Sequence, residues 1–187
     1  MRKLITVAIL VLAGPVLAPS ESEGQAYTFT FGGLLGLGGS FDESDAGYGN
    51  FSGQLSFTNT VADNTLVGIR VGGISWGSND ELGPLTGPSL LYATVAGEYK
   101  ETSGSFSGSF IESGVYIGLG YYKLDGDRTD GGVESDDGFG LTVGVTGDLP
   151  VNKRRNLALR IELAGHYADL DAAQLFGTAM IGLAYRY

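Results

Sequence analysis

The sequence predicts an all-β fold, an eight-stranded antiparallel up-and-down transmembrane β-barrel, and three observations lead to this prediction. The chain opens with an apolar export segment, which places the mature protein outside the cytosol. Eight later segments alternate large apolar residues with small ones, as strands with two different faces do. Aromatic residues gather near both ends of these segments, as they do at the two interfaces of a membrane barrel.

Composition excludes several classes of protein. Glycine accounts for 32 of 187 residues, but without the three-residue period of collagen. The chain has no cysteine and one histidine, which excludes a disulfide framework, a thiolate nucleophile and the usual zinc clusters. A net charge of −10 argues against a nucleic-acid partner, because phosphate binding needs a basic face. We therefore expect no metal, no cofactor and no nucleic acid.

Residues 1–26 read as a secretory signal. Arg2 and Lys3 form the positive start, and an apolar run follows them. Cleavage after Ala26 follows a small-x-small pattern and is preferred over cleavage after Ala18, where proline would come next. The alternative, an uncleaved anchor, needs about 20 apolar residues, and the run is shorter than that.

The mature part, residues 27–187, is predicted to be one barrel domain. Its strands follow from residue parity: large apolar residues occupy one parity, while Gly, Ser, Thr and Ala dominate the other. The clearest example is Phe139, Leu141, Val143 and Val145 alternating with small residues. The eight segments are residues 27–41, 51–58, 66–77, 90–100, 114–124, 139–149, 157–167 and 175–187.

The connections alternate in character. The first, third, fifth and seventh are polar and acidic, and in a barrel with both termini in the periplasm these face outward. Among the others, residues 150–156 carry three basic side chains. Residues 101–113 are long for an inner turn, and two interpretations stay open: a flexible linker, or strands that continue below the membrane. The outer acidic residues are Asp42, Glu43, Asp45, Asp80, Glu81, Asp125, Asp127, Asp130, Glu134, Asp136 and Asp137.

Alternation by itself fits a soluble lipocalin-like barrel as well as a membrane barrel. The polar face here carries too few charges for a solvated exterior, and suits the narrow interior of an eight-stranded barrel. The aromatic residues form two rings, as in the girdles of membrane barrels. The inner ring is Tyr27, Phe29, Phe57, Tyr99, Tyr185 and Tyr187, and the outer ring is Phe41, Phe51, Tyr121, Phe139 and Tyr167.

The C-terminal segment carries a family resemblance. Residues 180–187, MIGLAYRY, look like the final-strand signature of bacterial outer-membrane proteins, with Gly182, Tyr185 and Tyr187 at the matching positions and Tyr in place of the commoner Phe at the end. The mature chain resembles the small eight-stranded barrels of the OmpA transmembrane domain and of the OmpX/Ail type. This resemblance implies recognition of the three residues by the barrel assembly machinery, and we expect no peptidoglycan-binding domain of the OmpA kind after the barrel.

Five charged residues have the parity of the interior: Arg70, Glu98, Arg160, Glu162 and Arg186, with Lys100 and Asp148 near the inner rim. Buried charges must be paired, so we predict a lumen charge network. A salt-bridge network with a water-filled lumen is favoured over an ion pathway or gate, and little steady conductance is expected.

Two motifs resemble known functional sites, and each departs from the pattern that its site needs. His166 could belong to a lipid A deacylase of this fold, but the serine expected two residues later is Ala168. Residues 125–131 resemble a calcium loop superficially, with an arginine at its fourth position. We therefore expect the protein to have no enzymatic activity.

The sequence thus predicts a protein of the bacterial outer membrane, monomeric, in contact with outer-membrane lipid and lipopolysaccharide. Its expected role is structural or surface-interaction, in envelope integrity or adhesion, with mobile acidic outer loops. The alternatives are a narrow, porin-like channel and, further off, a lipid A-modifying enzyme or a soluble binding barrel.

Overall fold

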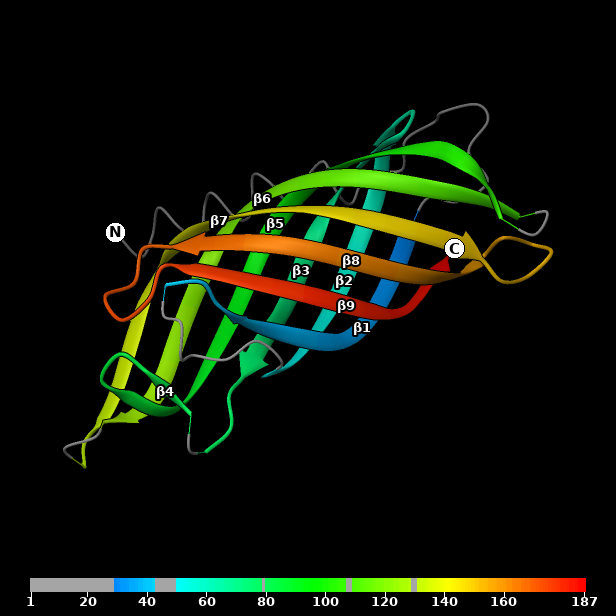
Figure 1. Ribbon diagram of the computed structural model, residues 1–187. Helices are drawn as coiled ribbons and strands as arrows, with labels where there is room; N and C mark the ends of the chain where they lie inside the picture. The colour runs from blue at the N-terminus through cyan, green and yellow to red at the C-terminus, as the bar shows by residue number, and fades with distance from the viewer. Residues whose placement is uncertain (1–28, 43–49, 79, 107–108, 129–130) are drawn as a thin grey trace.

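A computed structural model describes residues 29–42, 50–78, 80–106, 109–128 and 131–187, and the predicted leader, residues 1–26, lies outside them. The described residues form nine strands (Figure 1), and within them no helix has the length and apolar character needed to cross a membrane. The strands are β1 (Phe29–Ser40), β2 (Asn50–Ala62), β3 (Thr65–Ser75), β4 (Glu81–Leu82), β5 (Leu85–Phe106), β6 (Ser109–Arg128), β7 (Val133–Pro150), β8 (Leu157–Ala168) and β9 (Leu175–Arg186).

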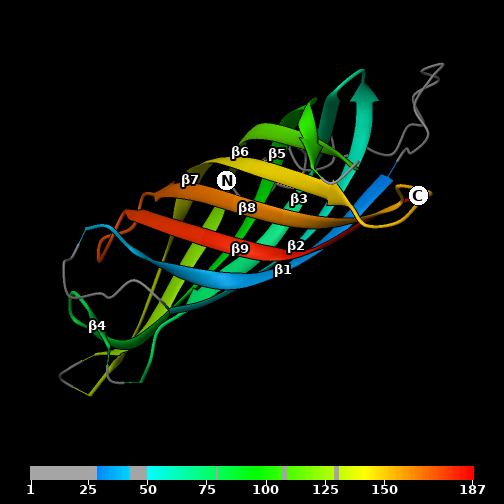
Figure 2. The ribbon, with the colours of Figure 1, turned by 45° about the vertical axis from the view of Figure 1, so that its right-hand side comes forward.

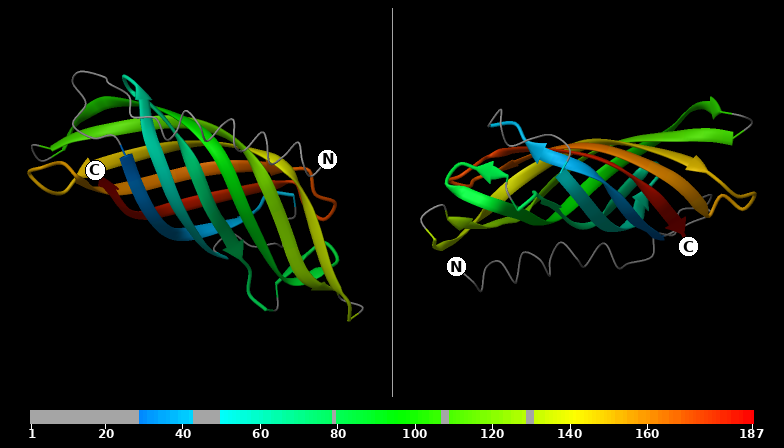
Figure 3. Two further views of the ribbon diagram at one scale, coloured as in Figure 1. Left: turned by 180° about the vertical axis from the view of Figure 1, so that it is seen from behind. Right: turned by 60° about the horizontal axis from the view of Figure 1, so that its bottom comes forward.

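Eight of these strands close into a barrel, which confirms the predicted fold class. Every pairing in the ring is antiparallel, in the order β3-β2-β1-β9-β8-β7-β6-β5, and pairing of β3 with β5 closes it. Figures 2 and 3 show the ring from three further sides, with β1 and β9 side by side along one wall. Closure leaves each barrel strand paired on both sides, as hydrocarbon surroundings require of backbone N–H and C=O groups.

The two ends of the barrel differ. The end that holds both Phe29 and Tyr187, which exchange backbone hydrogen bonds of 3.1 and 2.8 Å, is called the inner end below. The turns β2–β3, β5–β6 and β7–β8 lie at this end, and the opposite end is called the outer end. The predicted alternation of connections is therefore the observed one.

The boundaries of β5, β6 and β7 differ from those predicted. Residues 101–106 and 109–113 are strand and not a linker: β5 and β6 continue through them and pair with each other, with Glu101 opposite Ser113 and Phe106 opposite Ser109. At the outer end β6 and β7 also run on past the predicted limits, with Asp127 opposite Val133. Residues 125–128 are thus strand, which rules out a calcium loop built on them.

Side chains alternate between the two faces as parity predicted. Inward residues such as Leu34, Thr142 and Glu162 are buried. Outward apolar residues are exposed, with exposed fractions of 59% for Leu35, 69% for Leu119 and 61% for Phe139. A continuous belt of exposed large apolar side chains would be very unfavourable in water, because each costs roughly 1.5–3 kcal/mol relative to burial.

Candidate functional site

Among the described residues, buried ion pairs and side-chain hydrogen bonds concentrate in the lumen of the barrel. In its inner half they centre on Asp148. The carboxylate of Asp148 lies on β7 and is fully buried. Arg160 on β8 donates to both of its oxygens at 2.8 Å, and Arg186 on β9 donates at 2.9 Å. Lys100 on β5 forms a fourth, short hydrogen bond to it. One anion therefore ties together strands from opposite walls of the barrel.

A second centre forms around Glu162 on β8, nearer the middle of the barrel. Arg70 on β3 bridges Glu162 and Glu98 across the lumen, at 2.5 and 2.8 Å. Gln54 and Tyr116 also donate to Glu162, at 2.9 and 2.8 Å. Buried ions in this arrangement are stabilised only because each has a partner of opposite charge and further hydrogen bonds.

The two centres join through Glu98, which accepts hydrogen bonds from Arg70 and Thr146 and lies 3.4 Å from Lys100. The guanidinium of Arg70 also stacks over the ring of Tyr116, with 3.7 Å from its central carbon to the ring centroid. The structure thus brings Arg70, Glu98, Arg160, Glu162 and Arg186 into one connected set, together with Lys100 and Asp148.

One member of this set was missed by sequence reasoning. Glu112 on β6 accepts two hydrogen bonds from Arg186, at 2.9 and 2.6 Å. Continuing the parity of the predicted strand 114–124 back by two residues would have found it. With Glu112 included, the set is electrically neutral: four cations, Arg70, Lys100, Arg160 and Arg186, face four anions, Glu98, Glu112, Asp148 and Glu162.

The outer half of the lumen is packed with large apolar side chains, whereas the sequence predicts a water-filled lumen lined mostly by Gly, Ser, Thr and Ala. A single buried cluster fills it, and Trp76 packs edge-on against Phe176 at 6.3 Å between ring centroids. The cluster consists of Ile74, Trp76, Leu82, Leu85, Leu90, Tyr92, Tyr122, Leu124, Ala168, Leu170, Ala173 and Phe176. We call it the outer cap.

Part of the outer cap comes from a connection predicted to be a polar loop, residues 78–89. There β4 pairs with the start of β5, Leu82 opposite Leu85, and both side chains are fully buried. Gly83, at a φ of +58°, helps to reverse the chain between β4 and β5, and the N–H of Gly87 in β5 donates to the carbonyl of Asp80 at 2.8 Å. This small hairpin places Leu82 and Leu85 over the outer mouth of the barrel.

His166 lies buried just beneath the outer cap. Its Nδ1 is 3.1 Å from the hydroxyl of Tyr122 and its Nε2 is 3.4 Å from the hydroxyl of Thr178, while its ring lies 4.8 Å from that of Tyr92. Ala168, where the deacylase pattern has serine, is fully buried inside the barrel. A nucleophile–base–acid arrangement open to lipid is therefore not formed by the described neighbours of His166.

The three residues of the C-terminal signature point different ways. Tyr185 and Tyr187 are exposed on the outer surface of the barrel, at 46% and 81%, within the inner aromatic ring. Phe29 and Phe57 of the same ring stack at 5.5 Å. Gly182 faces the lumen where β9 meets β1, opposite Leu34.

The outer rim is acidic, and several of its carboxylates hold neighbouring strands and loops together. Asp42 accepts backbone hydrogen bonds from Gln174 and Leu175, which links the ends of β1 and β9. Lys123 donates to Asp125 at 2.8 Å, and this hydrogen bond lowers the pKa of the Asp125 carboxyl. Of the other predicted acidic positions, Glu43, Asp45 and Asp130 lie outside the described residues. Within the described part of the chain no group of three His, Asp or Glu residues is arranged to hold a metal.

Comparison with solved structures identifies the fold. The β-barrel of Neisserial surface protein A matches with a TM-score of 0.66 and 14% identity, over 85% of this chain and 97% of that one. The fold is that of the small outer-membrane barrels. The N-terminal barrel domain of Pseudomonas aeruginosa OprF matches with a TM-score of 0.58 and 11% identity, over 87% of this chain and all of that one.

A third match is Ail, the attachment invasion locus protein of Yersinia pestis, with a TM-score of 0.51 and 16% identity over 86% of this chain and 97% of that one. Ail has also been solved in complex with the heparin analogue sucrose octasulfate. No protein-family model and no curated protein sequence matches the chain. The apolar exterior and the fold together support the predicted location in a bacterial outer membrane.

Proposed function

We propose that the protein is a non-enzymatic, monomeric component of the bacterial outer membrane with a structural and surface-interaction role. The observation that carries this proposal is the filled lumen. The outer cap lies over a neutral ion-pair network whose central members are buried and whose Glu112 lies half-buried at the inner rim, so the lumen offers no evident path for ions. Monomeric behaviour is supported by the closed ring, in which all eight strands find their partners within the chain.

The surroundings of the barrel follow from the same proposal. Its apolar belt would contact outer-membrane lipid, and its outer rim would lie among lipopolysaccharide headgroups. Tyr185 on β9 and Tyr187 directly after it are exposed on the outer surface of the barrel, which supports their recognition by the barrel assembly machinery. The solved barrels with this fold include a surface protein and an attachment protein, which supports a surface role.

A pore is the competing function, and conductance distinguishes the two. An ion crossing the barrel would have to pass both the outer cap and the Asp148 and Glu162 centres. We therefore expect the purified protein in planar lipid bilayers to show no steady single-channel conductance, beside a general porin that conducts in the same bilayers. Reproducible steps of constant size would contradict the proposal, provided that the same sample is folded by its heat-modifiable migration on gels.

The charge of the outer rim indicates which partners the loops can bind. In contrast to the Ail complex with a heparin analogue, the rim here is acidic, with Asp125, Glu134, Asp136 and Asp137 on one hairpin. We expect no retention on immobilised heparin at physiological salt, because like charges repel. We also expect retention on immobilised polylysine that is lost as salt rises. Retention on heparin would contradict the expectation that the acidic outer rim binds cationic partners.

A further inference from the structure

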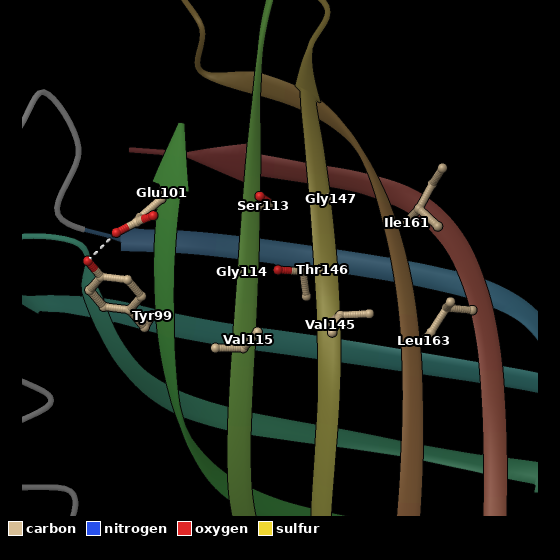
Figure 4. A pocket seen from close by; sticks show the side chains of 10 residues that line it. All are labelled: Tyr99, Glu101, Ser113, Gly114, Val115, Val145, Thr146, Gly147, Ile161 and Leu163. Atoms are coloured by element: carbon tan, nitrogen blue, oxygen red, sulfur yellow. Dashed lines mark hydrogen bonds between the residues drawn. The ribbon is translucent and has the colours of Figure 1, made fainter. Parts of the chain in front are cut away.

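A groove of about 650 Å³ lies on the lipid-facing side of the barrel, across β5, β6, β7 and β8 near the inner end (Figure 4). Its volume falls in the range of roughly 300–1,000 Å³ that is usual for small-molecule sites. Tyr99 and Glu101 stand at one side, while Ile161 and Leu163 stand at the other. The floor between them is formed by β6 and β7.

The groove exists because two adjacent outward positions are small. Ser113 and Gly147 are paired across β6 and β7, between Glu101 on β5 and Ile161 on β8. The next row toward the outer end is Tyr99, Val115, Val145 and Leu163, which is large throughout. A side chain on Gly147 would meet no atom within 4 Å of its Cβ, so the space in front of it is open.

The two ends of the groove differ in polarity. Leu163 and Val145 lie in the apolar belt and are exposed, at 52% and 48%. Tyr99 belongs to the inner aromatic ring, which in membrane barrels marks the level of the headgroups, and its hydroxyl donates to the carboxylate of Glu101 at 2.6 Å. Glu101 is exposed, and the described residues offer it no cation at ion-pair distance.

Positive charge lies at the same end of the barrel, on the other side of the groove. The turn that follows β7 carries Lys153, Arg154 and Arg155, all exposed, a few residues beyond Gly147. A carboxylate on β5 thus lines the groove, and a basic turn lies at the same end of the barrel, beyond the Leu149–Leu159 pair. This order complements a headgroup that carries an ammonium group and a phosphate.

We propose that the groove binds one phospholipid of the periplasmic leaflet with a primary ammonium headgroup. One acyl chain lies over Ser113 and Gly147 toward Leu163, the ammonium group pairs with Glu101, and the phosphate faces the basic turn. This proposal rests on the proposed outer-membrane location. The expected binding is modest, because exposed ion pairs contribute little each and the apolar contact competes with bulk lipid.

Native mass spectrometry of the refolded protein in detergent tests the proposal, with dioleoyl phosphatidylethanolamine and dioleoyl phosphatidylglycerol added in turn. The wild type should retain one phosphatidylethanolamine in preference to phosphatidylglycerol. Gly147→Leu should abolish retention, because leucine fills the groove without a clash. Glu101→Gln should lower the preference about three- to fivefold, as expected for an exposed ion pair.

Gly165→Leu is the matched control, because Gly165 also faces open space outside the groove, and it should retain lipid like the wild type. Equal retention by wild type and Gly147→Leu would overturn the groove as a lipid site. Equal retention of the two lipids by the wild type would overturn headgroup recognition. A failure of the outer-membrane location would look different, because the protein would then not refold into a heat-modifiable form in detergent.

Discussion

Asp148→Asn is expected to destabilise the barrel by about 3–5 kcal/mol, the cost of removing one partner from a buried ion-pair network. Asp148 is a shared ion-pair partner of Lys100, Arg160 and Arg186, and its side chain is fully buried. Asparagine keeps the shape of the side chain and removes the charge, so Arg160 loses its carboxylate partner, while Lys100 and Arg186 are left with Glu98 and Glu112 alone. The measurement is the midpoint of denaturant unfolding of the protein refolded into lipid vesicles.

Two further variants separate charge from packing. Asp137→Asn is the matched control, because Asp137 is exposed on the outer hairpin, where it accepts a hydrogen bond from Tyr121, and it should unfold close to the wild type. Adding Lys100→Met to Asp148→Asn removes one of the stranded cations and should recover part of the loss. If the free energy of unfolding of Asp148→Asn instead lies within about 1 kcal/mol of the wild-type value, as it does when surface charges are removed, then water screens the lumen charges. That result would contradict the proposal that the lumen is filled.

Gly182→Val should prevent the barrel from closing, with an expected cost of at least about 3 kcal/mol, the upper part of the range for overpacking. A Cβ at this position would collide with the carbonyl oxygen of Gly33 and lie 2.8 Å from the Cα of Leu34. Backbone atoms of a paired strand cannot move aside as a flexible side chain can. The measurement is the fraction of heat-modifiable, folded protein after refolding into detergent micelles.

The micelle experiment also separates two roles of Gly182, because micelles contain no assembly machinery. If Gly182→Val fails to fold in micelles, the barrel cannot close. If it fails only in cells, the result supports recognition of Gly182, Tyr185 and Tyr187 by the assembly machinery. Gly165→Val is the control, since its Cβ would meet open space, and it should fold normally. Normal folding of Gly182→Val in micelles would contradict the close approach of β1 and β9.

Residue parity predicted most of the charged lumen residues but not all of them. Parity places Arg70, Glu98 and Glu162 in the lumen, where the structure has them, because an extended strand alternates faces at every residue whatever its partner strand is. Glu112 was missed because the predicted strand began at residue 114, whereas β6 begins at Ser109. Polar, glycine- and serine-rich residues 101–113 carry no apolar alternation, and only their mutual pairing makes them strand.

The sequence by itself determined the class of fold, the two faces of each strand, the number of barrel strands and the acidic character of the outer connections, since all of these follow from local residue order. The tertiary structure decided which charges meet. Arg70 and Glu162 are 92 positions apart in the chain, and their contact depends on the register and tilt of the four strand pairings that separate β3 from β8 on either side of the ring. The tertiary structure also decided that Leu82 and Leu85, which lie in a connection predicted to be polar, are buried in the outer cap. A leucine in a polar connection becomes buried only when the closed ring provides a cavity for it.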